Sequence, residues 1–331
     1  MDVYIGIDVA CAKDKYLPLV MCYWENERLI PLPLASSPIK PPKGLGNALT
    51  LHDEVNEAFA EDVAQYIEGI CCGFKLNPVR IGIDSPLYPR DNNQPRRLAE
   101  QALDRAGISC YTTPSANDFV EIKAKGLTHI KQGKPKQNLP HSMQIFMLLG
   151  FALNKRLSQI APCIEVYPHA TVKRLGVANI HKSKGNQAEQ QLAAIGQHTG
   201  WPQTEEDWQA VNTICRGPMH DKVDAYSAAW VASLPEEKRM YFGEPDKNDA
   251  IWIPNVAPAE EAAIPQITKV TKTKSIQKPA NEDHQRLCPA CSNHVFKRWP
   301  FGWDAHAAHK CTGLEESGET ERKAEFKRRF M

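Results

Sequence analysis

The chain has 331 residues, of which 24% are charged and 42% are hydrophobic, and its formal net charge is +1. This composition excludes a collagen, a coiled coil and a wholly disordered chain, and the length predicts one large domain with a smaller module. Because 40 Lys and Arg residues balance 39 Asp and Glu residues, any nucleic-acid contact must come from a local basic patch.

The most apolar window, residues 143–153, covers about half of the ~20 residues that a bilayer helix needs. We therefore expect a buried helix over 142–157 and no membrane contact. The N-terminus starts with a strand-like run and has no secretory signal, so we expect a cytoplasmic protein whose scattered cysteines are reduced.

Apolar runs and helical spacing predict the elements in chain order. Strands are expected at 3–8, 16–24, 28–34, 79–84, 108–112 and 163–167, and helices at 52–70, 95–106, 142–157, 186–199, 205–215 and 221–234. The polar turn at 25–27 suggests an antiparallel start. Three leading strands followed by βαβ units predict an α/β fold with a ribonuclease H-like mixed sheet flanked by helices. A Rossmann fold is a weaker interpretation, because the turn after Asp8 contains no glycine.

Five acidic residues fall where this topology would bring them together. Asp8 and Asp84 end strands, Glu165 lies in a later strand, and Asp221 and Asp224 share one face of the last helix. Converging carboxylates need cations, and Mg²⁺ or Mn²⁺ prefers oxygen ligands. Two such ions ~4 Å apart can activate water and stabilise the leaving oxygen of a phosphodiester. Each aspartate alone would also suit a turn, a cap or a helix N-terminus.

Four motifs then carry a family resemblance. Residues 5–10, 81–87, 165–170 and 221–229 resemble successive motifs of the domain of unknown function 429 family, which comprises predicted nucleases of the ribonuclease H-like fold. The resemblance spans roughly residues 1–254, and residues 251–254 are similar to the family's closing strand.

The resemblance implies the roles of the acids. By it, Asp8, Asp84, Asp221 and Asp224 bind a pair of Mg²⁺ or Mn²⁺ ions, with Glu165 as a fifth catalytic acid. The acids are also similar to those of Holliday-junction resolvases, which are often dimers, so a homodimer is one expected state. Those resolvases have Glu in the place of Asp84, which leaves open whether Asp84 or Glu165 completes the site.

Basic residues near these motifs predict contacts with nucleic acid. The stretch 122–137 has no acidic residue and contains Gly126 and Gly133, which predicts a flexible loop that follows a phosphate backbone. A solvated surface loop is the alternative. Two arginines after the strand that ends at Asp84 could bind phosphate in a bidentate manner. The predicted nucleic-acid contacts here are Lys123, Lys125, Lys131, Lys134, Lys136, Arg96 and Arg97.

The C-terminal part divides into a linker, a metal module and a tail. Residues 254–284 are rich in Pro and Lys, which predicts a flexible basic linker. Residues 285–315 form a Cys/His module similar to a C2HC zinc finger, and a charged tail covers 316–331. The spacing predicts one structural Zn²⁺ held by Cys288, Cys291, His306 and Cys311.

Two questions about this module stay open at the level of sequence. His309 competes with Cys311 as the fourth zinc ligand. Lys297 and Arg298 suit contact with nucleic acid, and contact with a partner protein is the alternative.

Together these patterns predict a metal-dependent nuclease domain over residues 1–253 that acts on DNA or RNA, with a tethered zinc module that delivers the substrate. A role in defence against foreign nucleic acid fits this organisation. One alternative is a catalytically silent scaffold. The other is an ATPase similar to actin and sugar kinases, but the segment 9–15 lacks the glycine-bearing phosphate hairpin of that class.

Overall fold

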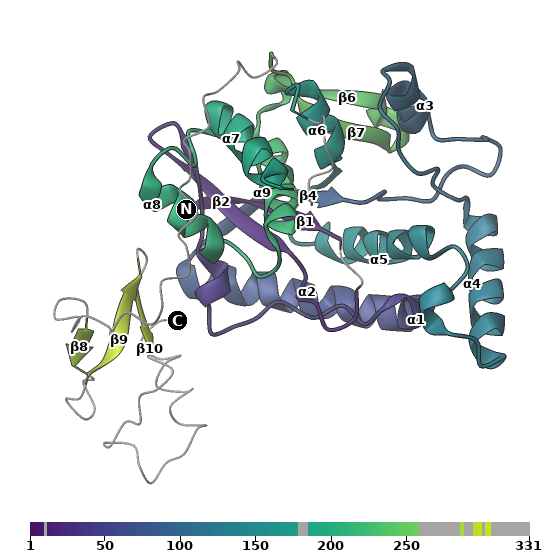
Figure 1. Cartoon of the computed structure of the whole chain (residues 1–331), viewed down its shortest axis with the longest axis horizontal. Helices are drawn as coiled ribbons and strands as arrows, with labels where there is room; N and C mark the ends of the chain where they lie inside the picture. The colour runs from purple at the N-terminus through teal and green to yellow at the C-terminus, as the bar shows by residue number, and fades with distance from the viewer. Residues whose placement is uncertain (10–11, 178–184, 258–284, 288–293, 300–301, 306–331) are drawn as a thin grey trace, which may run out of the picture. The chain divides into compact units, whose positions relative to one another are not determined.

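The computed structural model describes residues 1–9, 12–177, 185–257, 285–287, 294–299 and 302–305 (Figure 1). The chain divides into two compact units, residues 1–69 with 77–264 and residues 70–76 with 265–331. In the described parts of the chain, no helix is long and apolar enough to cross a bilayer.

A mixed five-stranded sheet forms the centre of the first unit, in the order β3-β2-β1-β4-β5. Strand β2 runs antiparallel to both of its neighbours, β1 and β3, while β1, β4 and β5 run parallel to one another. The predicted mixed sheet, including its three leading strands, is confirmed. The strands are β1 (Asp2–Asp8), β2 (Leu19–Glu25), β3 (Arg28–Pro31), β4 (Asn77–Asp84) and β5 (Cys163–Glu165).

Helices flank this sheet, with α9 and α7 on one face and α5 on the other (Figure 1). The helix predicted over 142–157 is α5, with the same bounds. The α-helices are α1 (Asn47–Thr50), α2 (Asp53–Phe74), α3 (Leu98–Arg105), α4 (Ala116–Lys131), α5 (Ser142–Leu157), α6 (Pro168–Arg174), α7 (Gln187–Thr199), α8 (Glu205–Ala210) and α9 (Met219–Ser233). Short 3₁₀ turns are η1 (Leu34–Ser36), η2 (Lys136–Asn138), η3 (Val211–Thr213), η4 (Glu236–Lys238) and η5 (Pro245–Lys247).

Glycines in the two central strands let α9 lie directly against the sheet. Gly6 of β1 and Gly82 of β4 are partners in the ladder. A Cβ atom on Gly6 would lie 1.9 Å from the carbonyl oxygen of Ala225, and one on Gly82 would lie 2.4 Å from that of Ala228. No larger residue fits at either position. This close approach brings Asp224, the residue before Ala225, to the ends of β1 and β4.

A buried cluster covers the outer part of the sheet under α7 and α9. Tyr226 of α9 is fully buried, and its hydroxyl donates a hydrogen bond to the carbonyl of Leu29 at 2.8 Å. This bond ties α9 to β3, so the helix is fixed at both the glycine contact and the sheet edge. The cluster includes Val20, Leu29, Leu192, Ile195, Trp201, Tyr226 and Trp230.

The strand predicted over 108–112 is absent, and that prediction is wrong. Side chains bind backbone groups of Ser109, Cys110 and Thr113, while at the two ends Ile108 N–H donates to the Leu103 carbonyl at 2.9 Å and the Pro114 carbonyl accepts from Arg90 N–H at 3.1 Å. Thr113 N–H donates to Glu100 Oε1 at 2.8 Å, the Cys110 carbonyl accepts from Arg96 at 3.0 Å, and the Ser109 carbonyl accepts from the Tyr167 hydroxyl at 2.9 Å.

The prediction of a flexible basic loop over 122–137 is also wrong for the first two thirds of that stretch, which belong to α4. A capping box between Ser115 and Asp118 begins this helix. Phe119, Ile122 and Gly126 are buried at helical spacing. A Cβ on Gly126 would lie 2.7 Å from Leu51 Cδ1, so this glycine permits close packing and does not make the segment flexible.

A hairpin of β6 (Arg239–Glu244) and β7 (Asp249–Pro254) follows α9. The closing strand expected at 251–254 is therefore present. It pairs with β6 in a separate two-stranded sheet, and a single bridge joins Trp252 to Val166 beyond β5.

In the second unit, β8 (Gln285–Leu287), β9 (His294–Trp299) and β10 (Gly302–Ala305) form an antiparallel sheet in the order β10-β9-β8. Lys297 and Arg298 lie on β9. The predicted zinc ligands Cys288, Cys291, His306 and Cys311, and the competing His309, lie outside the described residues, as do most of the linker and the tail.

We expect Gly6→Ala to lower the free energy of unfolding by about 3 kcal/mol, the upper end of the cost of an overpacked core. The added Cβ meets a backbone oxygen, which cannot rotate away. Chemical denaturation of the two proteins measures the difference.

Gly69→Ala is the matched control, because Gly69 lies in α2 and its added Cβ would meet only Ile39 Cδ1, at 3.8 Å. We expect a gain of up to about 1 kcal/mol for this variant. Equal stability of Gly6→Ala and the parent protein would show that α9 does not depend on the glycine contact.

Candidate metal site

Three carboxylates meet at the end of the central strands. Asp8, Asp84 and Asp224 each offer a carboxylate oxygen, and these atoms all lie within 4.8 Å of one another. Asp8 and Asp84 are partners in the β1–β4 ladder, while Asp224 comes from α9 and is 3% exposed. Two parallel strands and one helix thus build an acidic triad, the name used below for these three residues.

The chemistry of the triad suits a hard divalent cation. Carboxylates this close raise one another's pKa unless a positive charge compensates them. All three donors are oxygen atoms, which Mg²⁺ and Mn²⁺ prefer. Asp8 and Asp84 are partly exposed, so a substrate can reach a cation held there.

Asp221 lies one turn before Asp224 and outside the triad. Its Oδ1 atom is 3.1 Å from Nε2 of His220. Burial raises the pKa of Cys215 to about 12; Lys222 opposes the rise, while the charges of Asp221 and Asp8 add to it. Asp221 thus lies one helical turn from a member of the triad without joining it.

Glu165 forms a buried ion pair and does not belong to the triad. Its two oxygens accept hydrogen bonds from Arg97 at 2.7 and 2.9 Å, and a third bond comes from Leu87 N–H at 3.3 Å. Burial raises the pKa of Glu165, and Arg97 opposes that rise. Of the two acids that the sequence left open, it is Asp84 that the structure places beside Asp8 and Asp224.

The predicted phosphate ligands Arg96 and Arg97 both make contacts within the protein. Arg97 is 3% exposed, and its Nε donates to Asp249 at 2.9 Å, which argues against its predicted role. Arg96 binds the Cys110 carbonyl at 3.0 Å and Asp104 at 3.1 Å. The Arg96 side chain is 25% exposed, so its contact with nucleic acid stays a prediction.

The lysines of the 122–137 stretch divide into two groups. Lys123 pairs with Asp53 at 2.7 Å and Lys125 with Glu121 at 3.3 Å, both across helix surfaces. The remaining three are exposed at the end of α4 and in the turn after it, where contact with nucleic acid stays a prediction: Lys131, Lys134 and Lys136.

A basic surface that sequence reasoning missed lies beside the triad. Tyr16 has Lys43 Nζ at 5.0 Å and the Arg216 guanidinium at 5.1 Å from its ring centre. Backbone hydrogen bonds between 14–17 and 42–44 hold this region, and they leave Lys13, Lys15 and Lys43 exposed. The name Tyr16 platform denotes Lys13, Lys15, Tyr16, Lys43 and Arg216.

The platform is near the acids because of its connections along the chain. Asp8 N–H donates to the Pro18 carbonyl at 3.1 Å, which folds the β1–β2 connection back beside Asp8. Arg216 directly precedes Gly217, on which a Cβ atom would lie 3.3 Å from Asp221 Oδ2. In the sequence, Lys13 and Lys15 follow Asp8 and Arg216 precedes Asp221, whereas Lys43 lies near none of the predicted acids.

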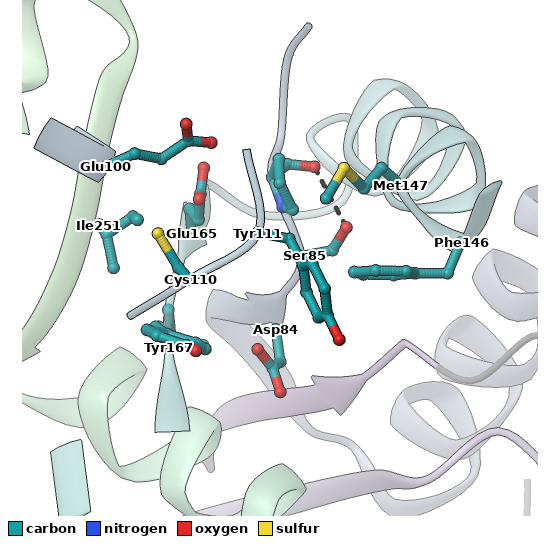
Figure 2. Close-up of a pocket in the computed structure, with 12 residues that line it drawn as sticks. Asp84, Ser85, Glu100, Cys110, Tyr111, Phe146, Met147, Glu165, Tyr167 and Ile251 are labelled. Carbon is teal, nitrogen blue, oxygen red and sulfur yellow. Dashed lines mark hydrogen bonds between the residues drawn. The ribbon is translucent and has the colours of Figure 1, made fainter. Parts of the chain in front are cut away.

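A pocket adjoins the triad at Asp84. Its empty volume is about 450 Å³, part of which is open to solvent. Figure 2 shows the Asp84 carboxylate at one end, between the rings of Tyr167 and Tyr111. Glu100 and Glu165 lie at the other end, so the pocket joins the metal site to a buried acidic region.

A family model described as "Protein of unknown function (DUF429)" matches residues 43–247, more than half of the chain. The matched region contains Asp84 and Asp224 of the triad, while Asp8 precedes it. No curated protein and no solved structure matches the chain.

We expect Arg97→Met to destabilise the protein by about 3–5 kcal/mol at pH 8, because it leaves Glu165 as a buried, uncompensated charge. Without Arg97 the pKa of Glu165 rises further above its unfolded value. Stability is then retained at low pH, where Glu165 is protonated, and is lost as the pH rises. The loss should therefore shrink at pH 5, as measured by urea unfolding at both pH values.

Arg156→Met is the control, because the ion pairs of Arg156 with Glu61 and Glu68 are partly exposed. Such a change should cost at most about 1 kcal/mol. A loss for Arg97→Met that stays the same at both pH values would contradict the assignment of an ion pair with Glu165.

Proposed function

The chain belongs to the DUF429 family, and we propose that it is a metal-dependent nuclease that hydrolyses phosphodiester bonds with Mg²⁺ or Mn²⁺ held at the acidic triad. The observation that carries this proposal is that Asp8, Asp84 and Asp224 bring carboxylate oxygens within 4.8 Å of one another from three separate elements. Such an arrangement at the carboxyl ends of parallel strands is a typical ligand position.

The topology supports the ribonuclease H-like interpretation. In the order β3-β2-β1-β4-β5 only β2 is antiparallel, as expected for a sheet that begins with an antiparallel meander and continues with parallel crossovers. The first acid ends β1, the second ends β4 and the third lies on α9. The resemblance drawn from the sequence places acids at the same three points.

The protein's own residues have separate tasks in this proposal. Asp224 is buried and anchored on α9, so it fixes the position of the site. Asp8 and Asp84 are partly exposed and would share a cation with the substrate phosphate. When bound, Mg²⁺ or Mn²⁺ would activate water and stabilise the leaving oxygen. Asp221 and His220 lie at the margin, where they can hold a water or a substrate hydroxyl by hydrogen bonds.

The Tyr16 platform supplies positive charge for the phosphate backbone. Lys13, Lys15 and Lys43 are exposed, and the contacts of Lys43 and Arg216 with the Tyr16 ring keep two of the cations together. Clustered cations beside an acidic metal site can hold the polyanion that the acids alone would repel.

The role proposed for the C-terminal module rests on its sequence alone. We propose that Cys288, Cys291, His306 and Cys311 bind one Zn²⁺ and that the module helps to bind nucleic acid or a partner protein. Its 14-residue spacing between Cys291 and His306 is that of a finger loop. A role in defence against foreign nucleic acid fits such a combination.

Asp8→Asn should reduce cleavage at least about 100-fold, since changes even behind the metal ligands cost 10–100-fold. Purified protein is stripped with EDTA, given Mg²⁺ or Mn²⁺ again, and tested on labelled single- and double-stranded DNA and RNA. Binding of Mn²⁺, followed by its electron paramagnetic resonance signal, should weaken in parallel.

Asp62→Asn is the matched control, the same change at an exposed position of α2, and should retain the cleavage. Absence of cleavage in folded wild-type protein on all four substrates, with ATP turnover also absent, would leave the scaffold alternative. ATP turnover without cleavage would favour the ATPase alternative.

Lys43→Ala should weaken binding to DNA or RNA by a similar factor for all sequences and reduce the salt-dependence slope by about 1, because one phosphate contact is lost. Fluorescence anisotropy across a salt series measures both effects. Lys155→Ala is the control, since exposed Lys155 of α5 pairs with Glu57. Equal salt-dependence slopes for the two variants would show that the Tyr16 platform does not contact the nucleic acid.

A further inference from the structure

The pocket beside Asp84 has aromatic walls from three separate elements. Tyr111 comes from segment 108–114, Phe146 from α5, and Tyr167 from the turn between β5 and α6. Tyr111 is 56% exposed, although its segment is held firmly by hydrogen bonds to neighbouring residues. An aromatic ring this exposed at the edge of a pocket has a free face on which a flat ligand can stack.

Tyr167 is fixed in position on the opposite wall. Its hydroxyl donates to the Ser109 carbonyl at 2.9 Å, and its ring lies 5.7 Å from the ring of His169. The two tyrosines flank the Asp84 carboxylate (Figure 2). A flat group that enters between them would therefore lie next to one of the three metal-binding carboxylates.

The inner end of the pocket is closed by a buried, paired carboxylate. Glu100 is 1% exposed, and its Oε1 atom accepts from Thr113 N–H at 2.8 Å. Its Oε2 atom forms an ion pair with Arg96, whose Nε is 3.5 Å away. This end of the pocket is therefore held in place by contacts within the protein.

These features together match the recognition of one nucleobase. Base–aromatic stacking is the usual way in which proteins hold unpaired nucleotides. Part of the pocket's empty volume of about 450 Å³ is open solvent, so a ligand can enter it from outside. A phosphate bound at Asp84 carries its sugar and base with it, so the base has a short path into the pocket.

Resting on the proposed function, we propose that this pocket receives one unpaired nucleobase of the substrate next to the scissile phosphate. The nuclease therefore acts on single-stranded nucleic acid, or on a nucleotide turned out of a duplex.

The test uses the full-length protein and single-stranded oligonucleotides that carry 2-aminopurine at successive positions, in Ca²⁺ and in EDTA. Stacking in the pocket quenches the probe at one position. Tyr111→Ala should abolish this quenching and weaken binding about tenfold, within the range for loss of one stacked base. Tyr241→Ala is the control, since Tyr241 is 49% exposed on the β6–β7 hairpin and does not line the pocket.

An abasic residue at the quenched position gives a second, independent measurement. It should weaken binding of the wild-type protein by the same factor and leave binding of Tyr111→Ala unchanged. Equal binding of abasic and intact strands by the wild-type protein overturns the assignment of the pocket.

The two proposals fail in different ways. Quenching that depends on Tyr111, with no cleavage of any substrate, would support the base pocket and overturn the nuclease. Metal-dependent cleavage that is equally fast on single strands and duplexes, with no effect of Tyr111→Ala, would support the nuclease and overturn the pocket.

Discussion

The contact between α9 and the sheet is the constraint on which the rest of the first unit depends. Gly6 and Gly82 remove the side chains that would otherwise hold the helix away, and backbone atoms of α9 fill that space. The burial of Tyr226 and Trp230 on the same helix then stabilises this position. Because Asp224 belongs to this helix, its distance from Asp8 and Asp84 follows from the packing of glycine against backbone.

A second constraint holds the opposite side of the site. Arg97 lies between Glu165 of β5 and Asp249 of β7, so one buried guanidinium joins the main sheet to the hairpin. Asp249 also accepts from Leu98 N–H at 2.7 Å and so caps α3. Glu165 and Asp84 belong to neighbouring strands and have opposite tasks, since one carboxylate compensates a buried cation and the other faces the space where a cation can bind.

The sequence predicted the sheet, and its five candidate acids included the three of the triad, because short local motifs carry both. Each central strand ends in Ile-Gly-Ile-Asp, and ladder pairing of two identical tetrapeptides brings Asp8 to Asp84. The errors arose where tertiary contacts decide. Nothing local to 108–112 says that side chains of Glu100, Arg96 and Tyr167 replace a strand partner. Likewise, Gly126 suggested flexibility, because the Leu51 side chain that needs its space lies far away in sequence.

The residues around the triad could not be assigned from the sequence for a related reason. A carboxylate next to an arginine and a carboxylate next to a metal look the same in a sequence, so Glu165 was indistinguishable from a ligand. The Tyr16 platform is assembled from three separate parts of the chain, at 13–16, at 43 and at 216. Only spatial pairing makes those cations a surface.

Side chains hold much of segment 108–114, which has a consequence for how this wall of the pocket can vary. Neighbouring strands in a sheet share one ladder of backbone bonds, whereas backbone groups of Ser109, Cys110 and Thr113 are each bound by a different side chain. A change at Glu100, Arg96 or Tyr167 would therefore remove one of these bonds without touching the pairing of β1 with β4. The wall that carries Tyr111 can thus be altered separately from the elements that carry the carboxylates.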